Sequence, residues 1–179
     1  MAIKNEKELF LGLGTNTGER EKNMTEAIEK LSLRFGIPIA QSKIVESEAW
    51  GYDSPNKYLN SVILFRTSLA PTEILNITEE IERELGRKQK TQNGNYSDRP
   101  IDIDILFYGS ECIDTPRLTI PHRLLHKRLF VLEPFAEIAP SSCIRYWKRA
   151  SDNYSMNLRR HKRINRKPLT TPTETVKFC

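Results

Sequence analysis

Two aspartates in the segment SDRPIDIDILFYG, residues 97–109, are placed where they could take part in chemistry. Asp102 and Asp104 alternate with three isoleucines, and successive side chains of a β-strand point to opposite faces. The isoleucines are expected to face the core, and both carboxylates to share the other face, with Cα atoms about 6.5 to 7 Å apart. Aspartate is depleted in strands, so the pair needs an explanation.

The charge of this pair admits two explanations. Carboxylates within about 5 Å of each other repel by roughly 3 kcal/mol at an effective dielectric constant of about 20, so a positive charge must lie nearby. Solvent and a surface lysine or arginine on an exposed sheet face could supply it. Alternatively, the pair could hold Mg²⁺, which binds one or two carboxylates and fills its other positions with water and substrate phosphates.

Cationic residues are frequent around the pair and favour the second explanation, because guanidinium and ammonium groups bind phosphate oxygens. No Walker A sequence is present, and GLGTNTG departs from the dinucleotide fingerprint. Side chains are therefore expected to bind the phosphates. The two histidines of this region are four residues apart without the glutamate of a zincin motif, which favours a phosphate or structural role. The cationic residues are Arg87, Lys88, Lys90, Arg99, Arg117, Arg123, Lys127 and Arg128, with His122 and His126.

The elements that would position these residues follow from the apolar spacing. Strands are predicted for ELFLGL, for residues 39–49 and 58–67, and around the two aspartates. Helices are predicted over residues 19–35 and 70–85, where apolar residues recur with helical spacing and a glycine follows. The order β-α-β-β-α-β predicts an α+β fold of the ferredoxin-like type, an antiparallel sheet with both helices on one face, plus C-terminal additions.

Composition predicts one domain over residues 1–147 and a basic, mobile tail over residues 148–179. The chain of 179 residues carries a net charge of +5, but the tail holds nine Lys or Arg against two Asp or Glu, so the first 147 residues are slightly acidic. No apolar run approaches the roughly 18 residues of a membrane span, and the start lacks the features of a secretory signal. Three scattered cysteines suit free thiols. We therefore expect a cytoplasmic protein.

Six motifs resemble, in their order along the chain, those of the 6-hydroxymethyl-7,8-dihydropterin pyrophosphokinase family of folate biosynthesis. The resemblance covers about residues 8 to 140. The motifs are LGLGTN (11–16), YLN (58–60), E-x-x-LGR (82–87), RPIDIDIL (99–106), LTIPH (118–122) and KRLFVLEP (127–134).

The resemblance implies an ATP- and Mg²⁺-dependent diphosphokinase. A pyrophosphoryl group would pass from ATP to the hydroxymethyl oxygen of the dihydropterin by attack at the β-phosphorus, with AMP leaving. Two Mg²⁺ ions would bridge the phosphates to Asp102 and Asp104, and Arg87 and Arg99 would join them as catalytic residues. No general base is evident, so metal coordination is expected to acidify the hydroxyl.

The same resemblance implies two sets of binding residues. The pterin would stack between Tyr58 and Phe130, although core packing is an equal alternative for both, and Asn60 would read its polar edge unless it faces solvent. The other expected pterin contacts are Ser47, Glu48, Trp50 and Tyr96. The expected ATP contacts are Glu79, Glu82, Arg87, Arg99, Ile105, Arg117, Thr119, His122 and Arg128.

A long polar loop over residues 87–98 is expected to act as a lid. It departs from the family pattern at Gln89, where many members have a second arginine, and at Tyr96, where tryptophan is frequent. Two other functions stay open. A non-catalytic module could bind nucleic acid through the basic tail, although it lacks aromatic residues interleaved with basic ones. A phosphotransferase of the same fold could act on another small alcohol. We expect a monomer that binds small molecules, neither a membrane nor nucleic acid.

Overall fold

The computed structural model describes residues 6–87 and 97–141. Its centre is an antiparallel sheet in which β1 (Lys7–Thr15) lies between β4 (Tyr58–Thr67) and β5 (Asp102–Tyr108). The predicted mixture of helices and an antiparallel sheet is therefore confirmed.

Two short strands, β2 (Ala40–Gln41) and β3 (Val45–Ser47), pair antiparallel with the outer side of β4. The prediction of one continuous strand over residues 39–49 is wrong. The break follows from Ser42, whose Oγ accepts a hydrogen bond from the backbone N–H of Val62 at 3.0 Å. A side-chain oxygen thus accepts the hydrogen bond of a β4 N–H that would otherwise donate to a backbone carbonyl.

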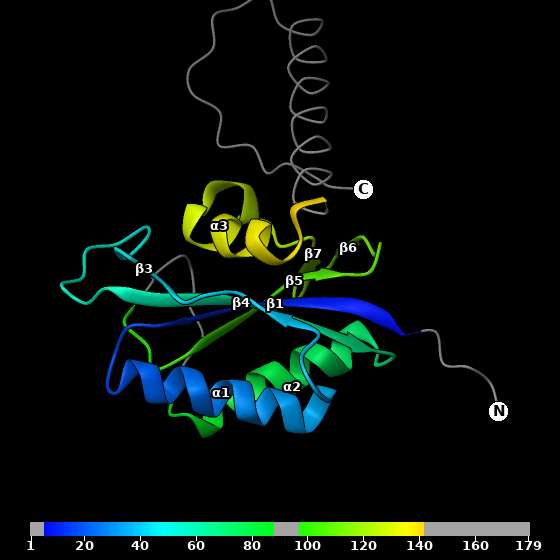
Figure 1. Ribbon diagram of the computed structural model, residues 1–179, viewed down its shortest axis with the longest axis horizontal. Coiled ribbons are helices and arrows are strands. Elements are labelled where there is room, and N and C mark those ends of the chain that lie inside the picture. Colours follow the sequence, from blue (N-terminus) through cyan, green and yellow to red (C-terminus); the bar gives the residue numbers. More distant parts are fainter. Residues whose placement is uncertain (1–5, 88–96, 142–179) are drawn as a thin grey trace, which may run out of the picture.

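Helices cover both faces of the sheet. The long helices α1 (Arg20–Phe35) and α2 (Pro71–Glu84) lie on one face, and α3 (Leu129–Ile138) lies on the other (Figure 1). Both long helices begin and end within a residue of their predicted bounds. Their buried residues recur every three or four positions, as the sequence pattern requires.

The side chains of β1 alternate between two hydrophobic cores. Its leucines pack beneath α1 and α2, whereas Phe10 packs with residues of α3. Gly12 and Gly14 follow Phe10 on the α3 face, because every second residue of a strand shares a face. The core under α3 therefore has no side chains from β1 beyond Phe10.

Short elements link β5 to α3. A two-stranded ribbon of β6 (Ile113–Asp114) and β7 (Thr119–Ile120) is followed by a single 3₁₀ turn, η1 (Leu125–Lys127). The backbone N–H of His122 donates to the carbonyl of Leu106 at 3.0 Å. This bond holds the LTIPH segment against β5.

Two of the sequence predictions lie outside the described residues. These are the central part of the expected lid, with Gln89 and Tyr96, and the basic tail on which the nucleic-acid hypothesis depends. Among the helices within residues 6–87 and 97–141, none has the length and apolar character needed to cross a membrane.

Candidate active site

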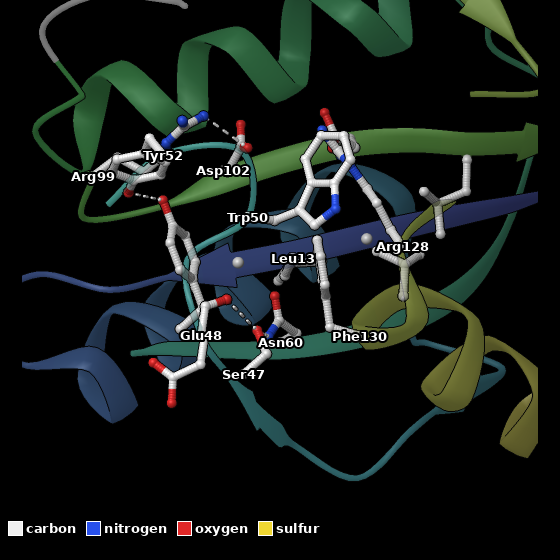
Figure 2. A pocket seen from close by; sticks show the side chains of 16 residues that line it. Leu13, Ser47, Glu48, Trp50, Tyr52, Asn60, Arg99, Asp102, Arg128 and Phe130 are labelled. Carbon is white, nitrogen blue, oxygen red and sulfur yellow. Dashed lines mark hydrogen bonds and ion pairs between the residues drawn. The ribbon is translucent and has the colours of Figure 1, made fainter. Parts of the chain in front are cut away.

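A pocket opens on the α3 face of the sheet, beside the core under α3 (Figure 2). Its empty volume, including the open mouth, is about 550 Å³. Many of the predicted site residues meet there, although they come from distant parts of the chain. Those that line it are Ser47, Glu48, Trp50, Tyr58, Asn60, Arg99, Asp102, Asp104, Arg128 and Phe130.

Three neighbouring strands form the floor of the pocket. In the antiparallel register, Asn60 of β4 and Asp102 of β5 both lie opposite Gly14 of β1, and Asp104 lies opposite Gly12. Because the glycines have no side chains, the carboxamide and the two carboxylates border an open strip of β1 backbone. A Cβ at Gly14 would lie 3.4 Å from Asn60 Oδ1, so any larger residue would fill the floor.

Each aspartate on this floor is paired with arginine. Asp102 accepts hydrogen bonds from Arg87 Nη1 at 2.5 Å and from Arg99 Nη1 at 2.9 Å. Asp104 accepts one from Arg128 Nη1 at 2.9 Å. All three arginines are buried. The positive charge that the sequence required is therefore supplied by three buried guanidinium groups, of which Arg99 and Arg128 line the pocket, and not by surface residues on an open sheet face.

The surroundings of Asp104 keep it ionised. Burial by itself would raise the pKa of this carboxyl, but His122 and Arg128 together lower it to about 2. The His122 imidazole lies with Nε2 3.7 Å from Asp104 Oδ2, and its Nδ1 accepts the N–H of Leu124 at 3.3 Å. Burial lowers the pKa of His122, although the nearby carboxylates of Asp104 and Asp102 oppose this shift.

Glu82 lies behind the pocket and holds Arg87. Its side chain is buried, pairs with the Arg87 guanidinium, and accepts the backbone N–H of Ile103 at 2.7 Å. The sequence placed Glu82 among the ATP contacts, but it does not line the pocket. It contacts an arginine and the backbone of β5 instead.

The remaining predicted ATP contacts lie away from the pocket. Arg117 Nη2 is 3.2 Å from Glu79 Oε2, which joins the β6–β7 ribbon to α2. Thr119 begins β7, and its hydroxyl is 3.4 Å from Arg123 Nη2. The side chain of Ile105 is buried in the core beneath α1 and α2, so a ligand could reach this residue only through its backbone.

Several pocket residues were missed by the sequence reasoning. Gly12 and Gly14 gave a usable signal, because alternate glycines within a strand mark a close approach of another group. Tyr52 lies in the turn-rich segment WGYDSPNK, which has no periodic pattern. Leu106 and Val131 resemble ordinary core residues in sequence. They belong to the core under α3 and also line the pocket beside it.

The two carboxylates suit a hard divalent cation that also binds substrate. Within the described ranges, no three His, Cys, Asp or Glu side chains come together as a metal site. Asp102 and Asp104 supply oxygen ligands on one face of β5 and line a pocket open to a ligand. This donor set fits Mg²⁺, because Mg²⁺ commonly takes one or two carboxylates and completes its shell with water and phosphate oxygens.

Comparison with known proteins decides the family. Residues 10–140 match the family model described as 7,8-dihydro-6-hydroxymethylpterin-pyrophosphokinase (HPPK). The chain belongs to this family. It is similar to 2-amino-4-hydroxy-6-hydroxymethyldihydropteridine pyrophosphokinase of Porphyromonas gingivalis, with 44% identity over 133 residues, which are 74% of this chain and 90% of that protein. The enzyme of the same name from Aquifex aeolicus is 42% identical over 133 residues, covering 74% and 81%.

A solved structure of HPPK-DHPS in complex with substrates shares the fold of this HPPK-family chain. Its TM-score is 0.60 at 15% sequence identity, over 75% of this chain and 40% of that one. At this identity the likeness concerns the fold alone.

Proposed function

We propose that the protein transfers a pyrophosphoryl group from ATP to the hydroxymethyl group of 6-hydroxymethyl-7,8-dihydropterin, giving AMP and the dihydropterin diphosphate in folate biosynthesis. One observation carries the proposal: in a chain of the HPPK family, a single pocket joins aromatic side chains to two carboxylates and two arginines. Flat aromatic substrates need the first feature, and phosphoryl transfer needs the second.

The pterin would occupy the part of the pocket between Tyr58 and Phe130. Both rings are half-buried and line the cavity, which supports stacking rather than core packing alone. Asn60 is buried, and its Nδ2 donates to Val45 O at 3.3 Å and to Ser47 Oγ at 3.0 Å. Its Oδ1 accepts no hydrogen bond from the described residues and borders the pocket floor, so it can accept an N–H of the pterin.

Asp102 and Asp104 would hold two Mg²⁺ ions. When bound, Mg²⁺ supplies charge neutralisation at the phosphates and acidifies the substrate hydroxyl. The arginines would then change partners. Arg87, Arg99 and Arg128 now donate to the two carboxylates, and phosphate oxygens would offer them equivalent charge-assisted hydrogen bonds. Positioning and electrostatic stabilisation of this kind account for most of the catalysis of phosphoryl transfer.

The rest of the nucleotide would lie beyond the edge of β5. The ribbon strand β7 and helix α2 both contact β5, and the contact between Arg117 and Glu79 brings them together. Arg117 and Glu79, together with Thr119 and His122, would surround the ribose and base of the ATP whose phosphates lie in the pocket. Ile105 would contribute backbone atoms, and Glu82 would support Arg87.

Several finer assignments belong to the same proposal. The strand order β2-β4-β1-β5, with a long helix after β1 and another after β4, supports a ferredoxin-like arrangement. The family match over residues 10–140 supports one catalytic domain within residues 1–147. A monomer in the cytoplasm stays a prediction from the sequence. Light scattering on a sizing column would test the monomer.

A product assay tests the function directly. The protein is incubated with ATP, 6-hydroxymethyl-7,8-dihydropterin and Mg²⁺, and the nucleotides are separated by anion exchange. We expect AMP to appear in equal amount with the dihydropterin diphosphate, to disappear with excess EDTA, and to return on addition of Mg²⁺. Formation of ADP alone, or no turnover, would contradict the proposal. Other small alcohols in place of the pterin test the second phosphotransferase hypothesis.

A further inference from the structure

The Asp98 carboxylate gathers hydrogen bonds from four side chains, although the residue itself is exposed. Its Oδ1 accepts from Asn16 Nδ2 at 2.7 Å, Tyr52 Oη at 2.8 Å and Ser54 Oγ at 2.7 Å. Its Oδ2 accepts from Asn56 Nδ2 at 2.6 Å. Three of these donors belong to the segment between β3 and β4, and the fourth follows β1. Asp98 therefore links three distant parts of the chain.

The hydrogen bonds of Asp98 continue through Tyr52 to Tyr58, a residue that lines the pocket. The Tyr52 hydroxyl has one proton, and Asp98 can only accept, so Tyr52 donates to Asp98. The hydroxyls of Tyr52 and Tyr58 are 2.8 Å apart, and Tyr58 must therefore donate to Tyr52. The relay from Tyr58 through Tyr52 to Asp98 fixes the ring of Tyr58, which lines the pocket beside Gly14.

The fourth donor anchors the relay to the sheet. Asn16 Oδ1 accepts the backbone N–H of Arg99 at 2.8 Å, and Asn16 N–H donates to the Arg99 carbonyl at 3.2 Å. Arg99 in turn donates to Asp102. The hydrogen bonds of Asp98 therefore connect the aromatic wall of the pocket with the backbone of a residue on its acidic floor.

The chemistry of Asp98 excludes two other roles. All four of its partners donate hydrogen bonds to the carboxylate, as donors do to an anion, and none of them adds a second negative charge with which to hold a cation. Partial burial would raise the pKa of Asp98, but the bonds from Ser54, Asn56, Tyr52 and Asn16 lower it to about 2. A carboxylate this weakly basic is a poor proton acceptor at neutral pH.

We propose that Asp98 is a positioning residue for the pterin, which sets the orientation of Tyr58 through Tyr52 and ties this wall of the pocket to Asn16 and the Arg99 backbone. The proposal rests on the proposed function, because it takes the ligand beside Tyr58 to be the pterin. It adds a residue that does not line the pocket and that contributes only through others.

The test compares Asp98→Asn with Asp53→Asn. Both substitutions remove one negative charge. Asp53 is an exposed residue of the segment between β3 and β4, and it makes no hydrogen bond or ion pair within the described part of the chain. The Kd of 6-hydroxymethyl-7,8-dihydropterin is measured by calorimetry with Mg²⁺ and α,β-methylene ATP, which cannot transfer its pyrophosphoryl group. We expect Asp98→Asn to raise this Kd about tenfold and Asp53→Asn to leave it unchanged. The KM for ATP should change in neither variant.

Tyr52→Phe tests the route. It keeps the ring and removes the hydroxyl, so it should also weaken pterin binding, and the double variant with Asp98→Asn should be less than additive because the two residues share one relay. Additive effects would overturn the route through Tyr52. Equal pterin Kd values for Asp98→Asn and Asp53→Asn would overturn the proposal, even if Asp98→Asn lowered the melting temperature, because Asp98 would then only stabilise the fold.

A second measurement separates this proposal from the proposed function. Amide hydrogen exchange over residues 52–58 should be faster in ligand-free Asp98→Asn than in wild type or Asp53→Asn. If wild type neither binds the pterin nor forms AMP but the exchange behaves this way, the proposed function fails while the relay stands. If the exchange rates are equal in all three proteins, the relay fails whatever the activity.

Discussion

Asp102 and Asp104 differ in how many buried cations each of them neutralises. Asp102 pairs with Arg87 and Arg99, whereas Asp104 pairs with Arg128 and lies farther from His122. From the sequence alone, removal of either carboxylate relieves a repulsion. In the structure, removal also takes a carboxylate from buried guanidinium groups, two at Asp102 and one at Asp104, although Arg87 keeps its ion pair with Glu82.

We expect Asp102→Asn and Asp104→Asn each to lower kcat by at least about 100-fold, as loss of a metal ligand would. Stability should separate them. Asp102→Asn should lower the free energy of unfolding by about 3 kcal/mol, because two buried guanidinium groups each lose one ion pair, and Asp104→Asn by about half as much, because one guanidinium group does. Urea denaturation and steady-state kinetics would measure both effects. Near-normal turnover would show that the pair holds no catalytic metal. Equal losses of stability would show that the number of arginines paired with each carboxylate does not set its contribution.

Asp98 predicts a pH dependence at the same scale. Its pKa is lowered to about 2 in the folded protein from an ordinary 3.8, so the folded state favours the ionised form. The stability it contributes is present above about pH 4 and is lost as the pH falls towards about pH 2. The difference in unfolding free energy between wild type and Asp98→Asn should be constant from about pH 5 to pH 8 and should shrink below about pH 4. A difference that grows on acidification would contradict this account.

At the scale of elements, the break between β2 and β3 depends on one hydroxyl. Ser42 is buried and accepts the Val62 N–H, and its Oγ also lies 3.2 Å from Ser61 Oγ. Ser42→Ala should lower the free energy of unfolding by about 1 to 3 kcal/mol, because a buried backbone donor loses its acceptor. Ser68→Ala is the control, since the Ser68 hydroxyl makes no hydrogen bond with the described residues. Equal effects in denaturant titrations would show that Ser42 does not support the strand pairing.

The sequence predicted those elements whose cause is local. Apolar spacing located both long helices, and strand alternation placed Asp102 and Asp104 on one face. The strand break was not predictable, because it depends on a hydroxyl of one segment meeting an N–H of another. The same limit applies to the site. The row of Asn60, Gly14 and Asp102 exists only once the register of three strands is set.

At the scale of the molecule, the catalytic unit should end before the basic tail. The family match ends at residue 140, and the described pocket residues lie between Gly12 and Val131. A chain ending at residue 147 should therefore keep the kcat and KM of the full chain. Loss of activity in a folded truncated protein would show that the tail belongs to the catalytic unit. A salt-sensitive affinity for RNA that disappears with the tail would support an additional nucleic-acid function.

The contacts of Glu82 also bear on solubility. β5 is the last strand on its side of the sheet, and unpaired backbone groups on such a strand can recruit a strand from another molecule. Here the Ile103 N–H donates to the Glu82 carboxylate, and the Leu106 carbonyl accepts the backbone N–H of His122. The chain next to the pocket floor therefore also occupies two backbone groups at this edge, so a change at Glu82 would expose one of them to intermolecular pairing as well as release Arg87.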